Sequence, residues 1–297
     1  MKNKLNRGLE NFVYKVFLSL LAVSAILFFT SKWWLYDDDP INQTPFNQDV
    51  AGLDQTTLVL KKWHYNPEKN LMEIMLETKH TGTDNVQPTF AFAAKASQTL
   101  DPYPVKIVYQ KENQFVLHVE QVQADYQLVG VFIKEFRNPK ILESATRDQL
   151  LAEGKVVSDE AISQNMPKPK EKVIVGDYRK VEVDTSLKEK TPAGYQEEFV
   201  LLEIEQLDKQ VQSIKQKQLP LQDEIIASIN HEIDQLESEM IYKTDEEKLE
   251  VQQQIAKKKS AIEDVHEKQK QYEQRVQALQ QKREKLLEKI EKIRNEK

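Results

Sequence analysis

The last hundred residues constrain the fold more than any other part of the chain. Residues 195–297 contain no glycine and one proline, Pro220, and they are rich in Glu, Gln, Lys and Leu. These residue types favour the helix, whereas Gly and Pro interrupt it. The composition therefore predicts long helices over this region.

Apolar side chains recur three and four residues apart along this region, in two stripes that we call the seam. This is the spacing of a heptad repeat, which suits one partner helix and is too narrow for a globular core. The first stripe consists of Val200, Ile204, Leu207, Val211, Ile214, Leu221, Ile225, Ile229, Ile233, Leu236 and Met240. The second consists of Val251, Ile255, Ile262, Val265, Tyr272, Val276, Leu279, Leu286, Ile290 and Ile293, interrupted by Lys258, Gln269 and Arg283.

A turn near residues 243–246 would bring the two stripes together. Thr244 can cap a new helix there, and Glu247 can reach back to it, as in a capping box. Residues whose numbers add to about 490 then face each other in an antiparallel pair. The facing pairs are Val200 with Ile290, Ile204 with Leu286, Val211 with Leu279, Ile214 with Val276, and Ile225 with Val265.

We therefore predict an antiparallel coiled-coil hairpin over residues 195–297, with arms of roughly 75 Å at 1.5 Å per residue. The alternative is one unbroken helix that pairs with a second copy of the chain. The seam continues through Pro220, which predicts a kink there and not the end of a helix.

The N-terminal part has the features of a membrane anchor. Residues 16–31 carry no charge, and the stretch from 12 to 36 would be about 37 Å long as a helix, enough to cross a ~30 Å hydrocarbon layer. Lys15, Lys32, Trp33 and Trp34 are the expected interface residues. A cleaved signal peptide is the alternative, but the Lys-Trp-Trp that follows the apolar run makes a poor cleavage site.

Charge predicts the orientation of this anchor. Lys2, Lys4, Arg7 and Lys15 precede the apolar run, and three aspartates at 37–39 follow it. The positive-inside rule then keeps residues 1–11 in the cytoplasm and places the remainder outside. We expect a single-pass protein of the cell membrane, in contact with lipid.

The middle of the chain has the residue pattern of a β domain. A spacer at 37–54 leads into six short strand-like runs within 55–153, which favour a small antiparallel sandwich. The runs are 57–65, 71–78, 89–94, 105–109, 115–122 and 126–134, followed by a short helix at 141–153. The fold class is therefore α+β.

The segment 154–194 is linker-like, with Pro167, Pro169 and Pro192 among Lys and Glu. Within it, residues 172–184 alternate in the manner of one extra strand. Four consecutive apolar residues at 199–202 cannot all face one partner helix. We predict that Phe199 or Leu202 packs on the β domain.

No pattern in the chain points to catalysis. There is no cysteine, and the five histidines form no i, i+4 pair or other metal-site or nucleophile motif. We therefore assign no catalytic, cofactor-binding or metal residue and expect no enzyme. The chain has a net charge of −6 and no block of basic residues, so we do not expect it to bind nucleic acid.

These features favour a structural or interaction protein, a scaffold or accessory subunit of a bacterial cell-envelope assembly for secretion, conjugation or cell-wall work. Its coiled coil would bind protein partners, and self-association into a homo-oligomer stays open. The order of anchor, β module and hairpin resembles the periplasmic adaptors of efflux pumps, although in that family the hairpin is inserted within β domains. A third hypothesis is an enzyme or sensor whose β domain binds a ligand, with Trp63, Tyr65 and Tyr103 as the exposed aromatic candidates to line a groove.

Overall fold

The computed structural model describes residues 12, 14–26, 40–82, 86–97 and 101–295, and the chain divides into two compact units, residues 1–43 and 44–297. In the first unit, residues 14–26 are helical and include Lys15. Lys32, Trp33, Trp34 and the other residues from 27 to 36 of the predicted anchor lie outside the described residues. Within the described part of the chain, no helix combines the length and apolarity needed to span a membrane.

The second unit contains a six-stranded sheet with the order β1-β2-β3-β6-β5. Its strands are β1 (Asp49–Val50), β2 (Thr56–Asn66), β3 (Leu71–His80), β5 (Val105–Lys111), β6 (Gln114–Val119) and β9 (Glu182–Val183). All neighbours along this order are antiparallel, while β9 pairs with β2 in parallel. We call this the large sheet.

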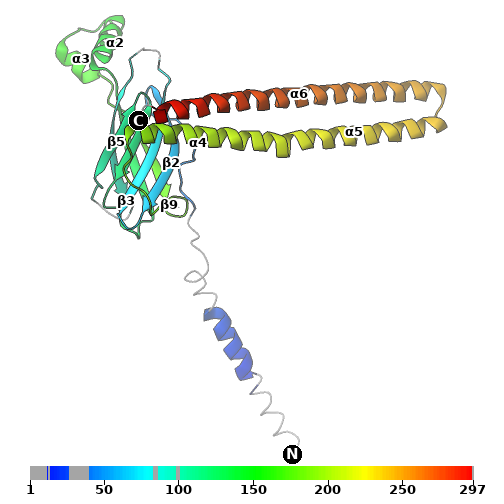
Figure 1. The fold of residues 1–297 in the computed structure, drawn as a ribbon, viewed down its shortest axis with the longest axis horizontal. Helices are drawn as coiled ribbons and strands as arrows, with labels where there is room; N and C mark the ends of the chain where they lie inside the picture. Colours follow the sequence, from blue (N-terminus) through cyan, green and yellow to red (C-terminus); the bar gives the residue numbers. More distant parts are fainter. Residues whose placement is uncertain (1–11, 13, 27–39, 83–85, 98–100, 296–297) are drawn as a thin grey trace, which may run out of the picture. The chain divides into compact units, whose positions relative to one another are not determined.

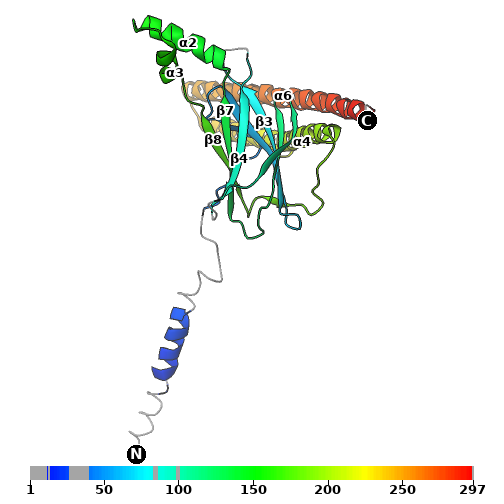
Figure 2. The same cartoon turned by 90° about the vertical axis from the view of Figure 1, so that its left-hand side faces the viewer.

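A second, small sheet consists of β4 (Thr89–Ala96), β7 (Leu128–Phe136) and β8 (Glu171–Asp177), all antiparallel. The two sheets share one hydrophobic core, in which the Phe90 and Phe92 rings of β4 lie 5.6 and 5.5 Å from the ring of Phe115 on β6. At Gly176 of β8, an added Cβ would lie 2.6 Å from the Trp63 ring, so only glycine lets the strand come this close. The sheets therefore form a sandwich, with the small sheet on one face of the large sheet (Figure 2).

The predicted α+β class, with antiparallel strands and a long C-terminal helix, is confirmed. Each of the six expected runs overlaps one of β2 to β7. The predicted extra strand at 172–184 corresponds to two strands, β8 on the small sheet and β9 on the large one. Part of the expected spacer belongs to the β domain, since Phe46 bridges to Leu60 and β1 pairs with β2.

Two short helices, α2 (Pro139–Ala152) and α3 (Asp159–Asn165), lie between β7 and β8. The sequence predicts the first, at 141–153, but not the second. Asn138 caps α2 and Ser158 caps α3, each accepting a hydrogen bond from a backbone N–H of the first turn. The helix α3 therefore has a regular N-cap inside a segment whose composition predicts a linker.

The C-terminal third forms two helical arms that run side by side (Figure 1). The first arm consists of α4 (Pro192–Ser213), a π-helical turn (Ile214–Gln218) and α5 (Leu219–Glu239), and the second is α6 (Asp245–Asn295). Ion pairs and hydrogen bonds between the arms join residues whose numbers add to about 490, the predicted register. They are Glu197 with Arg294, Asp208 with Arg283, Asp223 with Gln269, and Glu232 with Lys258.

The turn between the arms has the expected capping geometry. The Thr244 backbone N–H and hydroxyl both donate to the Glu247 carboxylate, at 2.8 Å each. The short 3-10 turn Met240–Tyr242 precedes it. Glu247 thus reaches back to Thr244 as predicted, which is one half of a capping box, and the chain reverses direction here without glycine or proline.

Leu221, next to Pro220, does not lie in the seam as the sequence predicts. Its side chain is 52% exposed, so this expectation is wrong. The N–H of Leu219 donates to the carbonyl of Ile214, which makes the turn before Pro220 a wide π-turn. Such a turn contains an extra residue, and it rotates the following helix. Leu219 and Gln222 face the other arm in place of Leu221.

The absence of cysteine allows the pairing of the arms to be tested directly. We expect Ile204→Cys/Leu286→Cys to oxidise to a disulfide within one chain, because both residues lie in one buried cluster between the arms. Non-reducing electrophoresis and peptide mapping would show a cross-linked monomer. The pair Ile204→Cys/Val265→Cys is the control, because residue 265 lies about 30 Å from residue 286 along α6, towards the turn. A disulfide-linked dimer would show instead that the arms pair between copies.

Candidate functional site

A row of polar residues crosses the outer face of the large sheet. Cross-strand neighbours place Glu182, His64, Glu73, His118 and Lys106 in one line over β9, β2, β3, β6 and β5. The residues on either side of Glu73, Met72 and Ile74, point into the sandwich core. The polar row therefore lies on the face of the sheet that the sandwich core does not cover.

The first turns of α4 cover the middle of this face. Tyr195 and Phe199 pack against Met75, Val116 and Tyr109, and the ring of Tyr109 lies 5.7 Å from Tyr195 and 6.1 Å from Phe199. We call these five residues the base contact. The prediction that Phe199 or Leu202 packs on the β domain is confirmed, since Leu202 is also partly buried against this cluster.

A hydrogen-bonded cluster lies beside the base contact. His118 Nε2 is 3.2 Å from Glu73 Oε2 and 3.3 Å from the Tyr195 hydroxyl. Glu73 and Tyr195 are 0% exposed and His118 is 3% exposed. We call these three residues the buried triad, and because Tyr195 belongs to α4, the triad joins the hairpin to the sheet.

Lysines compensate the buried charge of Glu73. The Lys62 ammonium lies 3.6 Å from Glu73 Oε1 and forms an ion pair with Glu198 of α4, which also pairs with Lys190. Burial by itself raises the pKa of Glu73, but the His118 hydrogen bond and the charges of Lys62 and Lys190 hold that pKa below its usual range. Burial raises the pKa of the Tyr195 hydroxyl. Near neutral pH, Glu73 is therefore an ionised acceptor and Tyr195 a neutral donor.

His64 lies next to Glu182 in the polar row, and its side chain is partly exposed. Its Nε2 lies 3.0 Å from Glu182 and its Nδ1 lies 3.6 Å from Asp184. Burial and the nearby Lys62 charge lower the pKa of His64, and the two carboxylates oppose this effect. The imidazole is therefore mainly neutral at pH 7.

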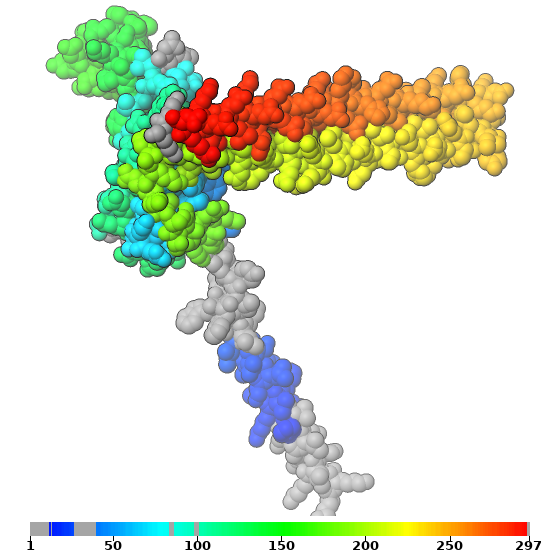
Figure 3. All heavy atoms as spheres, in the orientation of Figure 1, coloured from blue at the N-terminus to red at the C-terminus, as the bar shows by residue number. Residues whose placement is uncertain are grey.

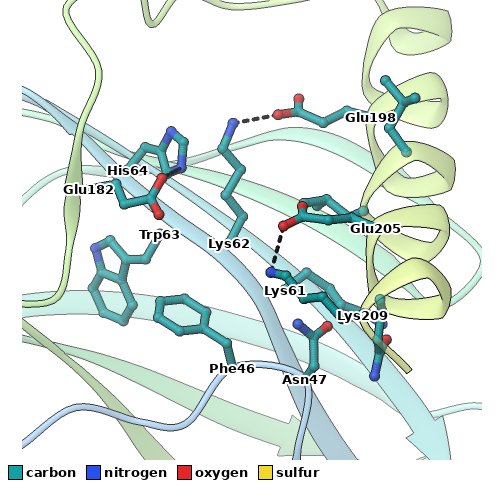
Figure 4. Close-up of a pocket in the computed structure, with 13 residues that line it drawn as sticks. Phe46, Asn47, Lys61, Lys62, Trp63, His64, Glu182, Glu198, Glu205 and Lys209 are labelled. Carbon is teal, nitrogen blue, oxygen red and sulfur yellow. Dashed lines mark hydrogen bonds and ion pairs between the residues drawn. The ribbon is translucent and has the colours of Figure 1, made fainter. Parts of the chain in front are cut away.

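A groove of about 460 Å³ opens between β2 and α4, next to His64 and Lys62 (Figure 4). We call it the base groove. Its apolar lining comes from Phe46, Trp63, Leu201 and Leu202, and its charged lining from Lys61, Lys62, Glu182, Glu198, Glu205 and Lys209. Each lysine has a carboxylate partner: Lys61 with Glu77, Lys62 with Glu198, and Lys209 with Glu205. A charged ligand would have to compete with these internal pairs.

The described residues do not gather three or more His, Asp or Glu side chains into a group that could hold a metal ion. Of the predicted groove residues, Trp63 lines the base groove but is only 1% exposed, and Tyr65 is buried in the sandwich core. Tyr103 packs against the same core.

The structure brings together most of the ten residues of the predicted facing pairs. An inner cluster next to the β domain contains Val200, Ile204, Val211, Ile214, Val276, Leu279, Leu286 and Ile290. An outer cluster near the turn contains Ile233, Val251 and Ile255, with Ile229, Leu236, Met240 and Ile262 packed against it. Ile225 and Val265 lie between the two clusters and are only half-buried. Gln222, 3% exposed, lies in the same stretch of the arms.

Sequence reasoning missed the buried triad. A histidine inside a strand run is expected to be a surface or half-buried imidazole, but His118 is buried because α4 covers the second face of β6. The available signal was an ionisable residue between two apolar ones in each of three neighbouring strands: His64, Glu73 and His118. The other face of these strands packs in the sandwich core. Ionisable residues on the opposite face are buried only if a second element covers that face and pairs with them.

We expect Phe199→Ala to lower the free energy of unfolding by about 3–5 kcal/mol, because it leaves a cavity in the base contact. Urea denaturation followed by circular dichroism measures the change. Leu201→Ala is the matched control on the same helix, at a side chain that is 45% exposed, and it should change the value by about 0.5 kcal/mol or less. Equal effects of both variants would contradict the base contact.

We expect Glu73→Gln to lower the free energy of unfolding at pH 7 by about 1–3 kcal/mol, because a neutral amide cannot compensate Lys62. The folded-state pKa of Glu73 is depressed, so its contribution is fully present above the unfolded-state pKa of about 4.3 and is lost as the pH falls through the folded-state pKa. The gap between wild type and variant should therefore narrow in acid. Glu120→Gln, at an exposed site just after β6, is the control, and a gap independent of pH would refute the ionised state of Glu73.

Comparison of the chain with protein-family models, with curated proteins and with solved structures gives no match. No relative therefore supplies a function for the base groove, the buried triad or the hairpin. The functional argument rests on the geometry of these parts.

Proposed function

We propose that the chain is a membrane-anchored, extracytoplasmic interaction protein that serves as a scaffold or accessory subunit of a bacterial cell-envelope assembly for secretion, conjugation or cell-wall work. Its helical hairpin is the part that binds partner proteins. The observation that carries this proposal is the hairpin itself. Its two arms pack their seam residues against each other, and the base contact and the buried triad hold its first turns on the large sheet.

Two properties of the hairpin support this role. Most of its seam residues pack between its own arms, so the outer faces of the arms are mainly polar and can meet a partner without unfolding. The base contact buries Tyr195 and Phe199, which holds the first turns of α4 against the sheet. Figure 3 shows the two arms in contact along their length, as a rod two helices wide. A stiff arm of this kind suits a protein that holds partners at a distance.

The membrane part of the proposal rests on sequence. The uncharged run at 16–31 and its flanking lysines and tryptophans favour an anchor, with lipid as its surroundings. The excess of Lys and Arg before the run favours a cytoplasmic N-terminus.

A ligand-binding sensor is a second candidate, and the base groove is the observation that favours it. Its volume is sufficient for a small molecule. However, its lysines are already paired with carboxylates, which leaves few groups to recognise a ligand.

Single cysteines test the proposed topology in the otherwise cysteine-free chain. We expect Gln274→Cys, exposed on α6, to react with a membrane-impermeant maleimide in intact cells, and Asn3→Cys to react only after permeabilisation. Mass spectrometry of the mature protein should show the N-terminal residues still present. Labelling of Asn3→Cys from outside, or loss of the first residues, would exclude this topology.

Photo-crosslinking tests the interaction role. A photo-reactive amino acid at Gln212 or Gln254, both exposed on the arms, should give adducts of defined mass in the native host. Lys155, exposed between α2 and α3, is the control position. The interaction role is excluded if the arms give no adduct and a pull-down from intact membranes recovers neither a partner nor a second copy.

A further inference from the structure

The turn of the hairpin exposes two large apolar side chains. Tyr242 is 90% exposed and Ile241 is 78% exposed, while Leu249, on the first turns of α6, is 58% exposed. Met240, the first residue of the 3-10 turn, packs on the outer cluster, so the seam ends there. We call residues 240–249 the tip, which forms the far end of the rod in Figure 3.

These side chains are not needed to make the turn. The Thr244 N–H and hydroxyl both donate to the Glu247 carboxylate, and the N–H of Lys243 donates to the carbonyl of Met240 at 3.3 Å. Polar residues at 241 and 242 would serve the backbone equally well and would be easier to hydrate. Adjacent exposed Ile and Tyr therefore indicate a contact with something else, since a rigidly presented aromatic ring is a frequent anchor of protein interfaces.

The charge around the tip restricts what that contact is. Between residues 232 and 250 there are eight Asp or Glu and two Lys, an excess as large as the net charge of −6 of the whole chain. An anionic membrane surface and the tip of a second copy would both be repelled by this charge. A protein surface with Lys and Arg would be attracted.

We propose that the tip docks into a partner protein through an apolar pocket that receives Tyr242 and Ile241 and has a rim of Lys and Arg. This inference rests on the proposed interaction role of the hairpin and assigns that role to one place on it. The two hydrogen bonds from Thr244 to Glu247 fix the backbone of the turn before binding, so little conformational entropy is lost when the partner engages.

The test places the aromatic photo-crosslinker p-benzoylphenylalanine at Tyr242 in the full-length chain in its native host. We expect one adduct with a protein other than the chain itself. Glu237→Lys/Glu239→Lys should reduce the adduct by about tenfold or more, since each 1.4 kcal/mol of lost attraction is a factor of ten. Both positions are exposed near the end of α5, where lysine suits the helix dipole, so the arm keeps its structure.

A control at another exposed apolar side chain distinguishes specific binding by the tip from non-specific hydrophobic contact. With the crosslinker at Ser238, exposed near the end of α5, Ile241→Ser/Tyr242→Ser should abolish the adduct, while Val156→Ser, at a side chain that is 85% exposed between α2 and α3, should leave it unchanged. Circular dichroism and oxidation of the Ile204→Cys/Leu286→Cys pair confirm that the hairpin remains folded in each variant.

Three outcomes would overturn the inference: an adduct with a second copy or with lipid, an adduct that survives charge reversal, or no adduct at Tyr242. If Gln212 or Gln254 still gives protein adducts in any of these cases, the interaction role of the hairpin stands and only the assignment to the tip falls. If no arm position gives an adduct, both fall together.

Discussion

The hydrogen-bonded contact of Tyr195 with Glu73 and His118 is the interaction on which the architecture depends. A buried carboxylate in the middle of a sheet is costly unless its oxygens are satisfied and its charge is compensated. His118 and Lys62 come from neighbouring strands, but the cover over Glu73 comes from the hairpin. The aromatic packing of Phe199 supplies non-directional attraction, and the directional bond between Tyr195 and His118 holds the first turns of α4 in place on the sheet.

The hairpin is uneven along its length, and this matters for its function. Next to the β domain, the inner cluster is continuous and close to the base contact. Beyond it, the π-turn before Pro220 and the buried Gln222 interrupt the apolar seam before the outer cluster begins. The outer cluster then supports an exposed apolar tip surrounded by acidic residues. The apolar surface available to a partner is thus placed at the end of the arm.

Particular residues show how far the sequence could predict this fold and site. The strand runs were predictable because their inward residues alternate with polar ones, and the register of the arms followed from the positions of the apolar pairs. Leu221 was misplaced because a proline can be accommodated by a widened turn, which heptad counting does not include. His118 was misjudged because its burial depends on a helix some eighty residues away in sequence.

The sequence by itself determined the helical arms, the strands and the turn at Thr244, because each depends on periodicity and on neighbours a few residues apart. Only the tertiary structure decided that the outer face of the large sheet is covered, that Glu73 and His118 are buried, and that a groove lies beside them. These features depend on contacts between β3, β6 and α4. The physical reason is that long-range burial is a property of the assembled layers, and local spacing along the chain does not specify which layer a polar face will meet.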